Sequence, residues 1–168
     1  MADVKPVTFE QLAEIANRVS PEYATRLLAL AGKESTFGKN PAAYKPNRVG
    51  AIGPMQILSS QLGGKYGNFE KYAAPGKTDP LNPLHAAEAG MRMAVDFFKT
   101  KGVDRGTMDY LGRGKKDALG TTPAGYLQDV NALENQVKAR LQKRAPPTMT
   151  TPTTQKSVED TVALLQDP

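Results

Sequence analysis

The chain has 168 residues, which suits one domain with a substantial core and is too short for two ordinary domains. It contains no cysteine and one histidine, which excludes disulfides, a cysteine nucleophile and a metal site built on several histidines. The formal net charge of +5 suits an anionic polymer, either a cell-wall glycan with its peptide carboxylates or a nucleic acid.

Two features of the chain bear on location. Residues 1–6 lack the basic and then apolar pattern of a signal peptide, and no run approaches the roughly 18 apolar residues of a membrane span. We therefore expect no membrane span. If the substrate lies outside the cytoplasm, a route other than a signal peptide must deliver the protein.

Helix signals begin near the N-terminus. Thr8 and Gln11 have the spacing of a capping box, and an apolar stripe at helical spacing follows. Ser20-Pro21-Glu22 predicts the start of a second helix, with an N-cap, a proline in the first turn and an acid facing the helix dipole. We expect this helix to end at Gly38.

The middle of the chain is rich in glycine and proline. Residues 38–55 are expected to form an ordered loop, residues 57–62 a short helix and residues 63–80 a second loop. Asn82-Pro83 then predicts a helix that ends at Gly102.

A small glycine-rich segment is expected at 106–120. Thr122-Pro123 starts a long amphipathic helix that ends in Lys143-Arg144, and Tyr126 lies on its apolar stripe.

The composition changes to proline and threonine from 145 to 156, which is typical of a linker, and 157–167 could form one short helix. Strand signals are scarce. The sequence therefore predicts a mainly α fold, with a domain over 1–144 and a tail over 145–168.

Glu34 is the most informative residue. It lies seven residues after Leu27 and four after Leu30, so it continues the apolar stripe of its helix. Burial disfavours the charged form, and a raised pKa would suit a general acid that protonates a glycosidic oxygen, as the acidic glutamate of lysozyme does. The alternative is an acid at a frayed helix end, paired with Lys33 or Lys39.

A turn and a polar side chain follow Glu34. Gly50, Gly53 and Pro54 allow a tight backbone path close to a ligand, and Met55-Gln56 comes next. A glutamine can hydrogen-bond an N-acetyl or hydroxyl group, and a methionine offers an apolar wall.

Glu34-Ser35-x-Phe37, followed by Gly50-Ala51-x-Gly53-x-Met55-Gln56-Ile57, resembles the Glu-Ser and Gly-Leu-Met-Gln motifs of the soluble lytic transglycosylase (goose-lysozyme-like) family. The resemblance covers about residues 8 to 144. It implies a lysozyme-like helical domain that cleaves the β-1,4 bond between N-acetylmuramic acid and N-acetylglucosamine in peptidoglycan.

The resemblance also implies site residues. Glu34 would be the sole catalytic acid and base, and Gln56 would bind substrate. Leu58 stands where the family often has a second methionine, and Asn47 stands where it commonly has a serine that contacts the substrate. The substrate-binding residues expected on this basis are Ser35, Asn47, Met55, Gln56, Leu58 and Tyr110.

The third family motif, Ala-Tyr-Asn-x-Gly, has its nearest match at Asp109-Tyr110-Leu111-Gly112. Tyr110 can take the place of the motif tyrosine, whose hydroxyl would lie near the glutamate, although Leu111 replaces the asparagine. The alternative for Tyr110 is a packing aromatic in a turn. A Tyr-Leu-Gly-x-Gly variant resembles virion-borne members of the family.

A two-carboxylate glycosidase needs a second acid, and Asp79, Asp104 and Asp109 are candidates only through the fold. The resemblance implies that none is needed, because the 2-acetamido group of the substrate stabilises the charged centre and the C6 hydroxyl closes a 1,6-anhydro ring. No metal or cofactor is expected.

The expected partner is therefore the peptidoglycan strand, with the protein carried in a phage virion and acting on the host cell wall. Residues 145–168 could bind other virion proteins, and nucleic acid is a further possible partner. Two alternatives stay open: a non-catalytic virion protein that binds glycan or DNA on a lysozyme-like scaffold, and a true lysozyme hydrolase.

Overall fold

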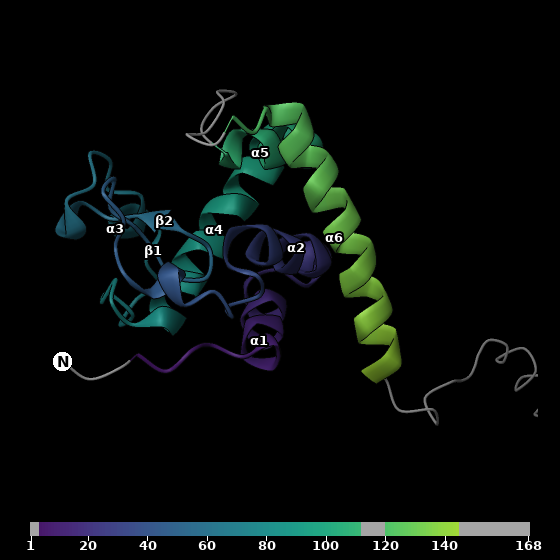
Figure 1. Cartoon of the computed structure of the whole chain (residues 1–168), viewed down its shortest axis with the longest axis horizontal. Helices are drawn as coiled ribbons and strands as arrows, with labels where there is room; N and C mark the ends of the chain where they lie inside the picture. Colours follow the sequence, from purple (N-terminus) through teal and green to yellow (C-terminus); the bar gives the residue numbers. More distant parts are fainter. Residues whose placement is uncertain (1–3, 112–119, 145–168) are drawn as a thin grey trace, which may run out of the picture. The chain divides into compact units, whose positions relative to one another are not determined.

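The computed structural model describes residues 4–111 and 120–144, which form six α-helices, three short 3-10 helices and one two-stranded hairpin (Figure 1). The prediction of a mainly α protein is thus confirmed. The expected linker and short helix between 145 and 167 lie outside the described residues, as does the part of the glycine-rich segment from 112 to 119.

The chain divides into two units, residues 1–137 and 138–168, at a boundary inside helix α6 (Pro123–Arg144). The core and the candidate site belong to the first unit. Of the second unit the structure describes residues 138–144, the last turns of α6.

Helix α1 (Phe9–Val19) begins at the predicted capping box. Gln11 N donates to Thr8 Oγ1 at 3.1 Å, and Thr8 N donates to Gln11 Oε1 at 2.9 Å, so two backbone donors at the helix start are satisfied reciprocally. The helix packs its apolar face into the core through Phe9, Leu12, Ala13, Ile15 and Ala16.

The second helix differs from the prediction at both ends. The chain first makes a 3-10 turn, η1 (Pro21–Tyr23), and α2 (Ala24–Ser35) starts after it. Ser20 makes no side-chain cap bond. The helix ends before Gly38 because Thr36 takes a left-handed conformation.

The helix predicted over 57–62 is wrong in its first part, since residues 57–58 are a strand and only residues 60–62 form a 3-10 helix. After the short helix η2 (Pro41–Tyr44), strands β1 (Ala51–Ile52) and β2 (Ile57–Leu58) pair in antiparallel register, Ile52 opposite Ile57. The β-branched pair suits a buried strand contact. Gly53 makes the turn at a φ of +85°.

Two further short helices follow the hairpin, and the second lies in the segment expected as a loop. Helix η3 (Ser60–Leu62) follows β2, and α3 (Asn68–Tyr72) follows at the place predicted as irregular. Helix α3 is five residues long and has no side-chain cap bond, so it carries no sequence signal of its own. Burial of Phe69 holds it on the core.

Helix α4 (Pro83–Lys101) begins and ends as predicted. Asn82 Oδ1 accepts from Leu84 N at 2.9 Å, and Gly102 is the C-cap. Helix α5 (Val103–Tyr110) follows directly, and residues 106–110 of it belong to the segment expected to be glycine-rich. Gly106 serves helix packing here, because a Cβ would lie 2.9 Å from the Phe97 carbonyl carbon.

Helix α4 is the element against which the hairpin and α3 pack (Figure 1). The contacting side chains of the hairpin, α3 and α4 are Ile52, Ile57, Phe69, Ala86, Ala89 and Met93.

Helix α6 starts at Thr122-Pro123 as predicted, with Gly125 N donating to Thr122 Oγ1 at 3.0 Å.

Candidate active site

The site is built around Glu34, in the last turn of α2. Leu27 and Leu30, on the same stripe, are fully buried, whereas Glu34 is half-buried. The stripe therefore leads from the core to a boundary position at Glu34. The carboxylate stays within reach of a ligand while its helix is fixed by the core.

Three consecutive residues beyond Ser35 have a left-handed backbone conformation, with φ angles of 54° at Thr36, 56° at Phe37 and 81° at Gly38. This conformation costs a non-glycine residue on the order of 1–2 kcal/mol. Two contacts hold it: the Tyr44 hydroxyl donates to Gly38 O at 2.6 Å, and the Phe37 ring covers Gly32, where a Cβ would lie 2.5 Å from the ring. The end of α2 is thus rigidly shaped.

Ser35 has a different place from the one predicted. Its side chain is 1% exposed; the hydroxyl donates to Ala31 O at 3.0 Å and accepts from Gly38 N at 2.9 Å. The structure corrects the substrate-binding assignment: Ser35 closes the helix end, because the turn that follows uses both functions of its hydroxyl.

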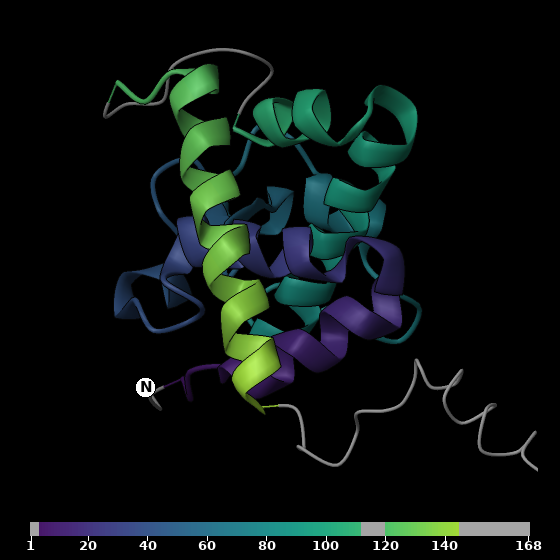
Figure 2. The same ribbon diagram turned by 90° about the vertical axis from the view of Figure 1, so that its right-hand side faces the viewer.

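Tyr126 of α6 is the direct partner of Glu34. Its hydroxyl donates to Glu34 Oε2 at 2.5 Å, and the residue is 1% exposed. Beside this bond, Lys33 Nζ pairs with Asp129 Oδ2 at 2.8 Å and lies 5.9 Å from the centre of the Tyr126 ring. These contacts join α6 to α2, and Figure 2 shows α6, coloured green, passing α2.

Tyr126 is the main site residue that sequence reasoning missed, since the helical spacing placed it only on the apolar stripe of its helix. A buried tyrosine hydroxyl needs a polar partner, so a tyrosine on the apolar stripe of this helix was a signal that a polar group lies opposite it.

The turn between β1 and β2 supplies Met55 and Gln56. Met55 is fully buried, and Gln56 takes a left-handed φ of 50°. Gln56 Nε2 donates to Ala43 O at 3.2 Å and to Gly53 O at 3.0 Å. Within the described residues its Oε1 has no donor, so a ligand could be bound there through an N–H or O–H group.

Tyr110, at the end of α5, is bonded to this turn. Its hydroxyl donates to Met55 O at 2.7 Å. Burial of the hydroxyl, and then the negative charge of Glu34, raise the pKa of Tyr110 well above its ordinary value. Tyr110 therefore stays neutral, and the charge of Glu34 contributes to this.

Gly90 of α4 makes this approach possible. A Cβ at Gly90 would lie 2.4 Å from Met55 Cβ and 3.1 Å from the Tyr110 hydroxyl. Sequence reasoning did not select Gly90. A glycine inside a helix costs about 0.5–1 kcal/mol against alanine, which is a signal of close packing.

Asn47 lies in the loop before β1, and Leu58 lies in β2. Asn47 is exposed, and its Oδ1 accepts from Val49 N and Ala51 N, both at 3.0 Å. This leaves the Nδ2 group of Asn47 for a ligand. Leu58 is half-buried in β2.

The candidate second acids have other surroundings. Asp109 is 5% exposed and pairs with Lys101 at 2.7 Å and Arg105 at 3.3 Å. The hydrogen bond from Lys101 contributes most to holding the pKa of Asp109 below its ordinary value. Asp79 and Asp104 are exposed, and Asp79 Oδ1 accepts from Leu81 N.

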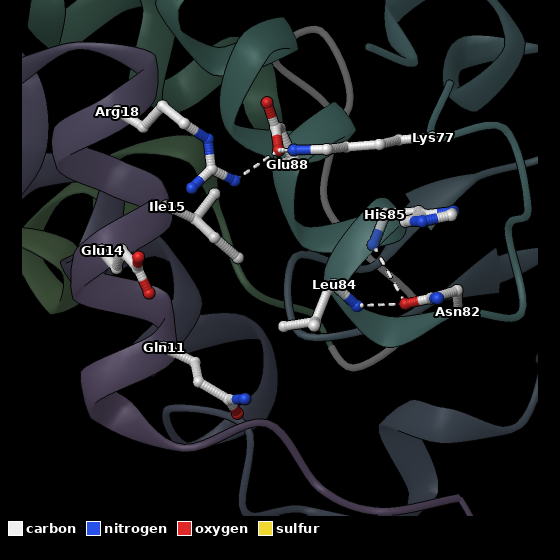
Figure 3. Close-up of a pocket in the computed structure, with 9 residues that line it drawn as sticks. All are labelled: Gln11, Glu14, Ile15, Arg18, Lys77, Asn82, Leu84, His85 and Glu88. Atoms are coloured by element: carbon white, nitrogen blue, oxygen red, sulfur yellow. Dashed lines mark hydrogen bonds and ion pairs between the residues drawn. The ribbon is translucent and has the colours of Figure 1, made fainter. Parts of the chain in front are cut away.

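A pocket of about 210 Å³ lies elsewhere, between α1, α4 and the segment before α4 (Figure 3). Its most buried charge is Glu88, 6% exposed, whose Oε1 accepts from Arg18 at 2.7 Å and Lys77 at 2.9 Å. Burial alone would raise the pKa of Glu88, but these two hydrogen bonds lower it. The three side chains tie α1 and the loop to α4.

In the parts of the chain that the structure describes, no group of three or more His, Asp or Glu side chains is arranged to hold a metal ion. None of the described helices combines the length and the apolar content that a membrane span requires. Comparisons with models of protein families, with curated proteins and with solved structures return no match to this chain.

Proposed function

We propose that the protein is a peptidoglycan lytic transglycosylase in which Glu34 is the catalytic acid and base. The observation that carries the proposal is the pairing of the Glu34 carboxylate with the Tyr126 hydroxyl at 2.5 Å, at a half-buried helix end. The motif resemblance supplies the substrate, the β-1,4 bond between N-acetylmuramic acid and N-acetylglucosamine.

The reaction needs one proton carrier. Protonated Glu34 gives its proton to the leaving oxygen as the C1–O bond breaks, and the 2-acetamido group of the substrate stabilises the positive charge at C1. Glu34, now a carboxylate, takes the proton of the C6 hydroxyl as O6 bonds to C1. The product is a 1,6-anhydro sugar, no water is consumed, and Glu34 regains its proton.

Three groups around Glu34 have roles in this scheme. The Tyr126 oxygen can keep its hydrogen bond to Glu34 in both protonation states by reversing the direction of donation. Gln56 Oε1 is an acceptor for a substrate N–H or O–H group, and the fully buried Met55 packs beneath this turn. Neutral Tyr110 holds the turn in place through Met55 O.

The decisive experiment is mass spectrometry of the muropeptides released from purified cell wall. Glu34→Gln keeps the shape and removes the acid, so we expect almost complete loss of release with the fold retained. The control is Glu22→Gln, an exposed glutamate of η1, which should cleave like the wild type.

The products separate the possible functions. A 1,6-anhydro end supports the proposal, whereas a reducing end would leave a lysozyme-type hydrolase in its place. Undiminished cleavage by Glu34→Gln would show that Glu34 is not the catalytic acid and base. Binding without cleavage by the wild type would favour a non-catalytic glycan- or DNA-binding protein, and DNA binding would weaken steeply with salt.

We further propose that the protein acts on the host cell wall as part of a phage particle. The support is the resemblance of the segment around Tyr110-Leu111 to virion-borne members of the family. Its detection in purified particles by mass spectrometry would test this proposal, and absence from them would refute it.

A further inference from the structure

Two surface loops are locked side by side near the hairpin. One precedes β1 and contains Arg48 and Val49; the other follows η3 and contains Lys65 and Tyr66. A Cβ at Gly50 would lie 2.5 Å from the Gly64 backbone, and Ser59 N donates to Gly50 O at 2.9 Å. The backbones therefore touch at Gly50 and Gly64, which fixes the residues beside them on one edge.

This edge exposes both apolar and cationic side chains. Val49 is 52% exposed and Tyr66 is 55% exposed. We name the set Lys45, Arg48, Val49, Lys65 and Tyr66 the basic loop edge; all five are exposed. Lys65 Nζ lies 5.5 Å from the centre of the Tyr66 ring.

The three cations have no anionic partner within the described parts of the chain. None of them forms an ion pair there. The acid of this region, Glu70, instead accepts from Ser59 Oγ at 2.6 Å, Ser60 N at 3.0 Å and Gln61 Nε2 at 2.9 Å. The positive charges of the edge are therefore available to an external anion.

The basic loop edge adjoins the loop of Asn47 and the turn of Gln56, two residues predicted to bind substrate. Arg48 and Val49 lie in the turn that Asn47 Oδ1 holds together. The same loop begins next to Ala43, whose carbonyl accepts from Gln56 Nε2. A polymer that lies along Gln56 and Asn47 would therefore continue onto the edge.

We propose that the basic loop edge binds the stem-peptide carboxylates of the peptidoglycan strand, with Tyr66 against a sugar or peptide face. This inference rests on the proposed function, since it names the part of the same substrate that lies beyond the cleaved bond. The carboxylates of a peptide-bearing strand are opposite in charge to the three exposed cations. A membrane surface fits less well, because one tyrosine and one valine offer little apolar area to insert.

The test uses full-length Glu34→Gln protein, which should bind without cleaving, and sedimentation with purified sacculi. In this background, the double variant Arg48→Glu/Lys65→Glu should bind sacculi about tenfold more weakly. Each exposed charge contact contributes up to a several-fold change in affinity, and the reversed charges would also repel the substrate carboxylates. The matched control is Lys99→Glu/Lys143→Glu, with the same change in net charge at exposed sites. It should bind within about twofold of the parent.

A second arm changes the substrate. Sacculi whose carboxylates have been converted to amides should bind the parent about tenfold more weakly, and the edge variant should lose no further affinity. Equal losses in the edge and control variants would overturn the proposal, and so would unchanged binding to amidated sacculi. If the edge variant lost binding to phosphatidylglycerol vesicles but still bound sacculi like the parent, the edge would be assigned to a membrane surface instead.

Failure of the edge and failure of the catalytic proposal have different readouts. Wild-type protein that releases anhydro products while the edge variant binds sacculi normally refutes the edge alone. Protein whose sacculus binding depends on the edge, but which releases no anhydro product, keeps the binding surface and refutes the catalytic proposal.

Discussion

Removal of one oxygen atom, in Tyr126→Phe, tests whether Glu34 depends on its partner from α6. The phenylalanine ring fills the same buried space, so the packing of a residue that is 1% exposed is preserved. The lost interaction is the 2.5 Å hydrogen bond to Glu34 Oε2.

The magnitude follows from the surroundings of the two groups. A hydrogen bond contributes about 0.5–1.5 kcal/mol between neutral groups and about 1.5–3 kcal/mol when one group is charged. In the proposed mechanism the resting Glu34 is protonated, and its side chain is half-buried, so we expect a loss of about 1 kcal/mol in the free energy of unfolding. The loss of orientation at the carboxyl should reduce the rate of glycan cleavage about 10- to 100-fold.

The chain offers a matched control in Tyr72→Phe. Its hydroxyl donates to Asp96 Oδ2, also at 2.5 Å, but on the surface between α3 and α4. We expect a loss below about 1 kcal/mol for this exposed pair and an unchanged cleavage rate.

Both variants would be assayed by urea unfolding and by the initial rate of muropeptide release. Wild-type cleavage by Tyr126→Phe would refute the dependence of Glu34 on this hydroxyl. So would an equal loss of rate in Tyr72→Phe, since the effect would then be general.

Two further predictions concern the surroundings of the site. Gly90→Ala places a Cβ 2.4 Å from Met55 Cβ, so the overpacking cost of about 1–3 kcal/mol should outweigh the gain of roughly 1 kcal/mol in helix propensity. Urea unfolding should therefore show net destabilisation. Adding Met55→Ala should not restore stability, because alanine keeps the clashing Cβ. Burial would raise the pKa of Glu70, but its hydrogen bonds, of which the one from Ser59 Oγ is the strongest, lower the pKa from an ordinary 4.5 to about 2. The charged Glu70 side chain therefore stabilises the fold above pH 4.5, and this stabilisation is lost as the pH falls toward 2. Glu70→Gln should therefore be less stable than the wild type at about pH 6, with a smaller difference at about pH 3, and a constant difference would contradict this assignment.

Local signals predicted the helix starts that depend on a few neighbouring residues. The capping box of Thr8 and Gln11 and the cap of Asn82 act within one turn of the chain, so the sequence contains the whole interaction. The hairpin at 51–58 and helix α3 were missed for the opposite reason. Their stability comes from contacts with α4, which no local pattern reveals.

For the site, the sequence by itself selected Glu34, Met55, Gln56 and Tyr110, because they belong to motifs of fixed spacing. It also selected Ser35, which the tertiary structure reassigns to closing the helix end.

Only the tertiary structure decided what surrounds the carboxylate. Tyr126 is separated from Glu34 by 92 residues, and Gly90 acts by letting Met55 and Tyr110 approach α4. A sequence pattern records spacing along one element, whereas these contacts depend on how α2, α4, α5 and α6 pack. The sequence determined which residue we propose as the proton carrier, and the packing of the helices determined what holds that residue in place.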